Sequence, residues 1–171
     1  MRDAQDLGAQ AWGADRAFWG TSGSTQNLQA LILSLADPGD TMLIPMNEHR
    51  ASWSLAMIAG LDLVPMLPPI DTIRGIENPM TAERVRSAIA ADPQAKAVIV
   101  VSPTFYGAVA DIGSIAEVTR AHGIPLIVDA AWGGAHGVCA GLLGSPITMG
   151  PMQWSRACTR QWARWRKVRS S

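Results

Sequence analysis

Two continuous apolar runs, each preceded by a helical pattern, constrain the fold of this chain more than any other feature. The runs KAVIVVS (96–102) and IPLIVDAAW (124–132) are typical of strands that are buried on both faces. Helical patterns precede them over 81–91 and 112–122. Strands that alternate with helices at this spacing predict an α/β fold, with a mostly parallel sheet and helices on both faces.

The N-terminal half of the chain shows the same alternation. Ser24 or Thr25 would cap the first helix, Thr81 would cap a later one, and Gly123 would end the last. Pro65 would place its strand at a sheet edge, because proline cannot donate a ladder hydrogen bond. In this half we predict strands over 16–21, 41–45 and 62–67, a helix between SGST (22–25) and DPGD (37–40), and a helix over 52–60.

Polar segments follow four of these predicted strands. In parallel sheets, ligands bind beyond the carboxyl ends of the strands. We therefore expect the four segments to form one neighbourhood. They are 22–25, 47–49, 102–106 and 129–136.

The segment Ser22-Gly23-Ser24-Thr25 lies between a predicted strand and a predicted helix. Hydroxyl groups and free backbone N–H groups at a helix N-terminus form a cradle that suits a phosphate. Serine and threonine are also ordinary helix caps. Both interpretations remain open at this point.

Asp129 ends a buried strand, where a carboxylate is costly unless it is paired or hydrogen-bonded. It could serve a ligand or cap the loop that follows. Trp132 and His136 could supply an aromatic wall and a hydrogen-bond donor beside it. His49, Thr104 and Tyr106 also follow strand ends, where loops often carry function, although each is equally compatible with a turn or surface role.

Together these residues are typical of a site for an aromatic cofactor that bears a phosphate. Pyridoxal phosphate needs a phosphate cradle, a flat side chain over its ring and a carboxylate that keeps the ring nitrogen protonated. The motifs also occur in a familiar order, and over roughly residues 4–150 the chain resembles the ornithine/lysine/arginine decarboxylase family. The motifs are GADRAFWGTSGSTQN, DPGD, NEHR, SPTFYG and VDAAWGGAH.

This resemblance implies a pyridoxal-phosphate enzyme of fold type I, the aspartate aminotransferase architecture. It implies that His49 stacks on the pyridine ring and that Asp129 pairs with the ring nitrogen, both as catalytic residues. Ser22 stands where the family often has asparagine, and Arg50-Ala51 replaces its usual Lys-Ser. The cofactor-binding residues that the resemblance implies are Gly23, Ser24, Thr25, His49, Thr104, Asp129, Trp132 and His136.

The same resemblance implies a carboxy-lyase that acts on a basic amino acid such as lysine, arginine or ornithine. It also implies a homodimer or higher oligomer, with sites shared between subunits, and no metal site. Another fold type I enzyme, such as an aminotransferase or a carbon–sulfur lyase, is the alternative within enzymes.

An enzyme of this type needs a lysine that forms a Schiff base with the cofactor. The chain has two lysines: Lys96 opens a predicted buried strand, and Lys167 lies close to the C-terminus. Arg160 stands where the resemblance places the lysine, and its guanidinium stays protonated and is a poor nucleophile. We therefore predict that this chain lacks the Schiff-base lysine and is inactive.

Residues 151–171 differ in composition from the rest of the chain. They contain six of the fourteen basic residues and none of the fourteen acidic residues. If the reading frame is shifted back by one base, the codons of Met152-Gln153 force alanine, and those of Trp162-Ala163 force glycine. One permitted reading is DAVVACVHKAVGALAQSS, which places a lysine at position 160. The hypothesis is a frameshifted tail, foreign to the fold, on a partial major domain over 1–150.

The overall composition is that of a single globular unit. The length of 171 residues predicts about one domain, and the 48% hydrophobic content suits a buried α/β core. Cys139 and Cys158 are too few for a disulfide framework. No apolar run approaches the roughly 18 residues of a membrane span, and residues 1–12 lack a signal-peptide pattern, so we expect a cytoplasmic protein without a membrane partner.

Two non-catalytic alternatives concern the same chain. In one, the basic tail would bind nucleic acid or anionic lipid. Nucleic acid is disfavoured as a partner, because Arg160, Arg164 and Arg166 form no clean stripe with the tryptophans. In the other, the chain is a scaffold that joins intact relatives.

Overall fold

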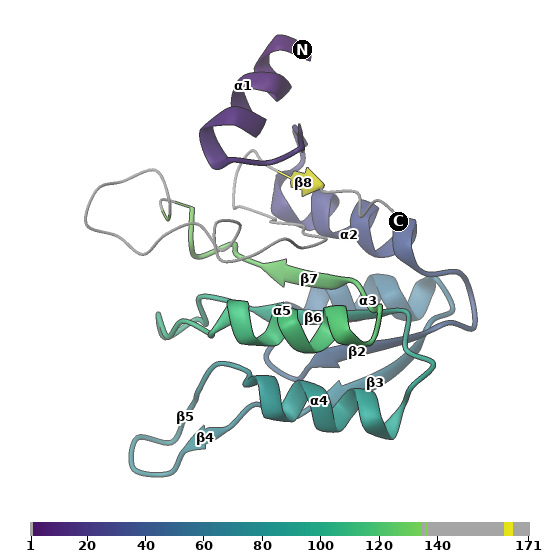
Figure 1. The fold of residues 1–171 in the computed structure, drawn as a ribbon, viewed down its shortest axis with the longest axis vertical. Helices are drawn as coiled ribbons and strands as arrows, with labels where there is room; N and C mark the ends of the chain where they lie inside the picture. The colour runs from purple at the N-terminus through teal and green to yellow at the C-terminus, as the bar shows by residue number, and fades with distance from the viewer. Residues whose placement is uncertain (1, 135, 137–162, 166–171) are drawn as a thin grey trace.

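The structure is a computed structural model, and it describes residues 2–134, 136 and 163–165 (Figure 1). Strands and helices alternate along most of this length. In chain order the elements are α1 (Arg2–Trp12), β1 (Arg16–Phe18), α2 (Gly23–Leu35), β2 (Thr41–Pro45), α3 (Arg50–Ile58), β3 (Asp62–Met66), β4 (Ile70–Asp71), β5 (Ile76–Glu77), α4 (Ala82–Ala91), β6 (Ala97–Val101), α5 (Ile112–Ala121), β7 (Leu126–Asp129) and β8 (Ala163–Trp165).

A four-stranded parallel sheet forms the centre of the described region. Its strand order is β3-β2-β6-β7, and its register pairs Val101 with Asp129 at the carboxyl end of β6 and β7. The predicted parallel sheet is therefore confirmed. Pro65 lies in β3, which is an edge strand of this sheet, as the missing N–H group predicted.

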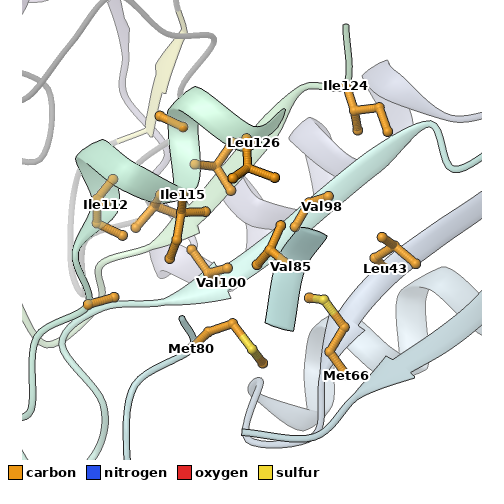
Figure 2. Packing of buried hydrophobic residues seen from close by; sticks show 14 of the residues in the cluster. Leu43, Met66, Met80, Val85, Val98, Val100, Ile112, Ile115, Ile124 and Leu126 are labelled. Atoms are coloured by element: carbon orange, nitrogen blue, oxygen red, sulfur yellow. The ribbon is translucent and has the colours of Figure 1, made fainter. Parts of the chain in front are cut away.

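Helices cover both faces of the sheet, as predicted from the alternation. Every residue of β6 and β7 is buried, and successive side chains point into two different cores. On one face Val98 and Val100 pack with Ile112 and Ile115 of α5 (Figure 2). On the other face Ile99 joins residues of α2 and α3. This double burial explains why the strands read as continuous apolar runs.

The helix ends are partly as predicted. Thr81 caps α4, because its Oγ1 accepts a hydrogen bond from the backbone N–H of Arg84 at 3.3 Å. Gly123 follows α5 with a φ of +68°, which favours glycine. The expected cap of α2 at Ser24 or Thr25 is wrong, because the helix begins at Gly23 with Ser22 as its N-cap.

The start of α2 shifts towards the N-terminus for an identifiable reason. The side chain of Gln26 reaches back, and its Oε1 accepts a hydrogen bond from the backbone N–H of Ser22 at 3.3 Å. This bond satisfies a donor that a helix would otherwise leave open. Ser24 and Thr25 therefore lie within the first turn of the helix.

Other boundaries also differ from the sequence-based expectations. The strand expected over 124–132 is limited to β7, because the carboxylate of Asp129 accepts a hydrogen bond from the backbone N–H of Ala131 and turns the chain. The strand expected over 16–21 ends at Phe18. The helix α1 and the short β4–β5 hairpin were not predicted, since neither carries a long apolar pattern.

β1 lies outside the central sheet and pairs antiparallel with β8, with Arg16 opposite Trp165. β8 is the described part of residues 151–171, so the predicted domain boundary at 150 and the foreign nature of the tail stay predictions. Among the described helices, none combines the length and the apolar character needed to cross a membrane.

Candidate functional site

Three of the four predicted segments meet at the carboxyl end of the sheet. Residues 47–49 follow β2, residues 102–106 follow β6, and residues 129–136 follow β7. The backbone N–H of Ser102 donates to the carbonyl oxygen of Asp129 at 2.9 Å, which joins two of these segments directly. The site therefore forms where parallel strands end, as the fold predicts.

Asp129 is a buried acid at the carboxyl end of β7. Only 6% of its surface is exposed, and its Oδ1 accepts a hydrogen bond from the backbone N–H of Ala131 at 2.9 Å. Burial raises the pKa of the Asp129 carboxyl above its ordinary value, against the opposing effects of Ala131, Glu48 and His49. Asp129 thus caps the following loop, as one of its two predicted roles requires, and its service to a ligand stays a prediction.

His49 lies beside Asp129 and begins α3. Its Nδ1 accepts a hydrogen bond from the backbone N–H of Ala51 at 3.2 Å, which makes it the N-cap of the helix. The ring is exposed to solvent and lies close enough to Asp129 to favour the ionised form of that carboxyl. The sequence-based pairing of these two residues in one site is consistent with this geometry, while stacking of His49 on a cofactor ring stays a prediction.

Glu48 is a site residue that the sequence analysis did not single out. Only 6% of its surface is exposed, and its Oε1 accepts a hydrogen bond from the Ser52 hydroxyl at 3.0 Å. Burial, and then the charge of Asp129, raise the pKa of the Glu48 carboxyl well above its ordinary value. The available signal was the spacing of four residues between Glu48 and Ser52 at the start of a predicted helix, but this spacing does not reveal burial.

Aromatic rings connect the loops after β6 and β7. The ring centroids of Phe105 and Trp132 lie 5.4 Å apart in an edge-to-face arrangement, and Phe105 packs in the same way on Tyr106 at 5.4 Å. All three side chains are largely exposed, including 61% of Trp132. Trp132 therefore packs against the loop after β6 through Phe105, a partner that the sequence analysis missed, and its role as an aromatic wall for a ligand stays a prediction.

Thr104 and His136 occupy the same pair of loops. Thr104 is buried, and its Oγ1 accepts a hydrogen bond from the backbone N–H of Ala108 at 3.3 Å. The backbone N–H of His136 donates to the carbonyl oxygen of Gly133 at 3.0 Å. Both residues stabilise loop structure, and their contact with a cofactor stays a prediction.

The predicted phosphate cradle begins α2. Ser22 is exposed and makes no capping hydrogen bond through its side chain, and a Cβ placed on Gly23 would meet no heavy atom within 4 Å. Ser24 and Thr25 are half-buried in the first turn. The N-terminus of this helix favours an anion, whereas phosphate binding and the proximity of this segment to Asp129 stay predictions.

Lys96 is the only lysine among the described residues, and it lies at the wrong end of the sheet. It directly precedes β6, and its backbone N–H donates to the carbonyl oxygen of Thr41 at 2.8 Å. Val101, the partner of Asp129, lies five positions further along the chain, which corresponds to about 16 Å along a strand. Lys96 is therefore a solvent-exposed residue before the strand. Arg160 and Lys167 lie outside the described residues.

These residues fit the ring half of a pyridoxal-phosphate site. The buried Asp129 carboxylate at a strand end suits a protonated ring nitrogen, and the exposed imidazole of His49 lies beside it. No group of three or more His, Cys, Asp or Glu side chains that could hold a metal ion occurs within the described part of the chain.

Solved structures define the class of protein to which this fold belongs. The N-succinyldiaminopimelate aminotransferase of Mycobacterium tuberculosis superimposes with a TM-score of 0.75 at 19% identity, over 96% of this chain and 47% of that one. The aspartate aminotransferase of Thermus thermophilus with maleate gives a TM-score of 0.72 at 21% identity, over 96% and 46%. The predicted fold type I architecture, that of aspartate aminotransferase, is confirmed.

Within this class the chain belongs to the Orn/Lys/Arg decarboxylase family. The sequence profile of the family's major domain matches residues 1–150. The chain is 34% identical to the arginine decarboxylase of Halalkalibacterium halodurans over 133 residues, which is 78% of this chain and 27% of that protein. The arginine decarboxylase of Bacillus subtilis is 33% identical over the same shares. The chain therefore spans about a quarter of the length of these curated relatives.

Proposed function

We propose that this chain forms the cofactor-ring side of a pyridoxal-phosphate-dependent carboxy-lyase that acts on a basic amino acid, such as lysine, arginine or ornithine. The observation that carries the proposal is the buried Asp129 carboxylate at the end of β7, beside His49. Bound pyridoxal phosphate supplies an electron sink for the bonding electrons that the departing carboxyl group leaves behind.

Each residue of the site has a distinct role in this proposal. Asp129 accepts a hydrogen bond from the ring nitrogen and holds its proton, while His49 covers one face of the ring. The backbone N–H groups and hydroxyls of residues 23–25 bind the phosphate, because the N-terminus of α2 favours an anion. The remaining residues that line the proposed site are Thr104, Trp132 and His136.

The role of Asp129 can be tested by measuring pyridoxal-phosphate affinity in equilibrium dialysis. Asp129→Asn should weaken binding by roughly tenfold or more, because a hydrogen bond to a charged group contributes about 1.5–3 kcal/mol. Asp62→Asn is the matched control, since Asp62 is exposed at the start of β3, the opposite end of the sheet. Equal affinity of the two variants, or no binding by the unaltered chain, would contradict the proposal.

We further propose that the chain binds the cofactor without covalent attachment and is inactive in decarboxylation. The position of Lys96 at the other end of β6 supports this proposal, as does Arg160 at the position expected for the lysine. Borohydride treatment in the presence of pyridoxal phosphate should leave no adduct at a specific lysine in peptide mass spectra. Stoichiometric modification of Lys96 or Lys167 would overturn this expectation, and a Lys96→Arg variant would then identify the site.

An aminotransferase is the second candidate, because relatives of that activity also match. The L-glutamine:scyllo-inosose aminotransferase of Streptomyces griseus is 33% identical over 111 residues, which is 64% of this chain and 23% of that protein. The longer protein that the shifted reading frame would encode can distinguish the two. Release of carbon dioxide from a basic amino acid supports the decarboxylase, and formation of a keto acid supports the aminotransferase.

The partners of the intact protein are part of the same proposal. We expect a small amino-acid substrate, assembly as a homodimer or higher oligomer, and a cytoplasmic location without nucleic acid as a partner. Family membership supports the substrate class and the oligomer.

A further inference from the structure

We propose that Glu48 is a positioning residue that carries a proton and donates it in a hydrogen bond to the Asp129 carboxylate, so that the two acids share one negative charge. The inference concerns the chain without any cofactor. The shared proton is therefore tested independently of the proposed function, whereas the positioning role rests on it.

The backbone places the Glu48 side chain against the sheet edge. Glu48 lies in the turn between β2 and α3, and its backbone N–H donates to the carbonyl oxygen of Pro45 at 3.0 Å. The Ser52 hydroxyl, one helical turn further on, donates to Glu48 Oε1 at 3.0 Å. These two bonds fix the carboxyl group inside the protein, where its other oxygen, Oε2, is buried and finds no donor among the described residues.

The group that Glu48 faces is also an acid. Its carboxyl lies within hydrogen-bonding reach of the Asp129 carboxyl, and only 6% of each residue is exposed. Two ionised carboxylates in contact repel each other strongly when water is excluded, so one proton is retained between them. A proton on Oε2 turns an unpartnered acceptor into a donor for Asp129, and it removes the repulsion at the same time.

The surrounding donors indicate which acid keeps the proton. Asp129 receives the backbone N–H of Ala131 at 2.9 Å and faces the His49 ring, and both favour a carboxylate. Glu48 accepts a hydrogen bond from the Ser52 hydroxyl, which together with the neighbouring backbone of His49 favours its ionised form, but burial and the Asp129 charge outweigh both. These contacts support a neutral Glu48 beside an ionised Asp129.

Besides each other, the two acids face one further titratable group, the His49 ring. Asp129 comes from β7, and Glu48 and His49 come from the turn before α3. A neutral Glu48 would hold the Asp129 carboxylate in one orientation, because its carboxyl O–H donates a hydrogen bond to one of the Asp129 oxygens. Under the proposed function, the opposite side of that carboxylate is left for the cofactor ring nitrogen, so Glu48 would act through Asp129 without touching the cofactor.

Infrared spectroscopy of the chain without cofactor at neutral pH tests the proposal. We expect the C=O stretch of a protonated carboxyl group that disappears in Glu48→Gln and persists in Glu117→Gln, a control at an exposed position of α5. Absence of the band, or its persistence in Glu48→Gln, would overturn the proposal. Because the unaltered chain is itself measured, the test does not depend on the folding of a variant.

A second measurement distinguishes a proton-bearing role from simple packing. In NMR titrations with carboxyl-labelled glutamate, Asp129→Asn should move the Glu48 titration to lower pH, because the repelling charge is removed. An unchanged Glu48 titration would contradict the shared charge. If the pair behaves as proposed and pyridoxal phosphate still does not bind, the proposed function fails and the inference on Glu48 stands.

Glu48→Gln and Glu48→Ala then test the positioning role through cofactor affinity. The amide of glutamine can still donate to Asp129, so Glu48→Gln should retain the affinity of the unaltered chain for pyridoxal phosphate. Glu48→Ala should lose about tenfold, the loss expected for one hydrogen bond to a charged group. Equal losses in both variants would show that packing alone accounts for the effect.

Discussion

The two acids at the carboxyl end of the sheet differ in how far the sequence reveals them. Asp129 could be predicted, because it directly follows three buried apolar residues of one strand. Glu48 could not be predicted, because its burial depends on β7 lying close to the loop after β2. These two strands are separated in the sheet by β6 and in the sequence by more than half of the described chain. No local pattern carries that information.

The raised pKa of Glu48 makes a prediction about pH-dependent stability. Because the folded state binds the proton more tightly than the unfolded state, this group stabilises the fold fully below its ordinary pKa of 4.5. That stabilisation is lost as the pH rises through the folded-state pKa. Glu48→Gln removes the titrating group, so the variant should gain stability relative to the unaltered chain as the pH increases from about 4.5.

Urea denaturation at a series of pH values measures this difference. As the pH rises, the free energy of unfolding of the unaltered chain should fall relative to that of Glu48→Gln, so the variant should depend less on pH. If the two plots of unfolding free energy against pH run parallel from about pH 4 to about pH 8, Glu48 does not have a raised pKa in the folded state.

At the scale of elements, the alternation of strands and helices was predictable and the ends of the elements were less so. The apolar runs of β6 and β7 required burial on both faces, and α4 and α5 supply one of the covering layers. The start of α2 was misplaced, because the backward hydrogen bond from Ser22 to Gln26 cannot be distinguished in the sequence from a cap at Ser24. Local competition between capping side chains therefore limits the prediction of helix ends.

The contact between the β6 and β7 loops gives a prediction at this scale. A Cβ placed on Gly133 would lie 2.9 Å from Cδ of Pro103, and a proline ring cannot move aside easily. Gly133→Ala should therefore reduce the free energy of unfolding by about 1–3 kcal/mol, the usual effect of overpacking. Thermal or urea denaturation measures the change.

The double variant Gly133→Ala/Pro103→Ala provides the control for this prediction. If the steric contact is the cause, removing the proline ring should recover part of the lost stability, as a positive coupling in a double-mutant cycle. Strictly additive effects of the two substitutions would show that the loops are not in contact through these residues.

At the scale of the whole molecule, the family and the major-domain fold could be recognised from the order of the motifs, and the profile match over residues 1–150 agrees with that reading. The arrangement of the central sheet followed from βαβ alternation alone. The antiparallel pairing of β1 with β8 could not be predicted, because the sequence around β8 shows no strand pattern. Long-range antiparallel pairing leaves no periodic signal in a strand of three residues.

The frameshift hypothesis makes a prediction about the coding DNA. Resequencing the bases that encode residues 145–171 should reveal a missing or extra base, after which the shifted frame reads His-Lys at 159–160 and stays open past the codon for residue 171. A confirmed frame without further coding sequence would mean that the basic tail, with six of the chain's fourteen Lys and Arg residues, is a genuine part of the protein. The chain would then be a member of its family without the Schiff-base lysine and with another role.

The double burial of β6 has a consequence for how the sheet is aligned during folding. A strand with one apolar and one polar face has a single favourable register, because a slip by one residue exposes its apolar side chains. β6 carries apolar residues on both faces, so such a slip changes little in the cores. Alignment must then be decided at the strand ends, where Lys96 bonds to Thr41 and Ser102 bonds to Asp129. The edge of the sheet that carries the candidate site therefore also helps to set the register of β6, because a shifted strand would lose the hydrogen bond between Ser102 and Asp129.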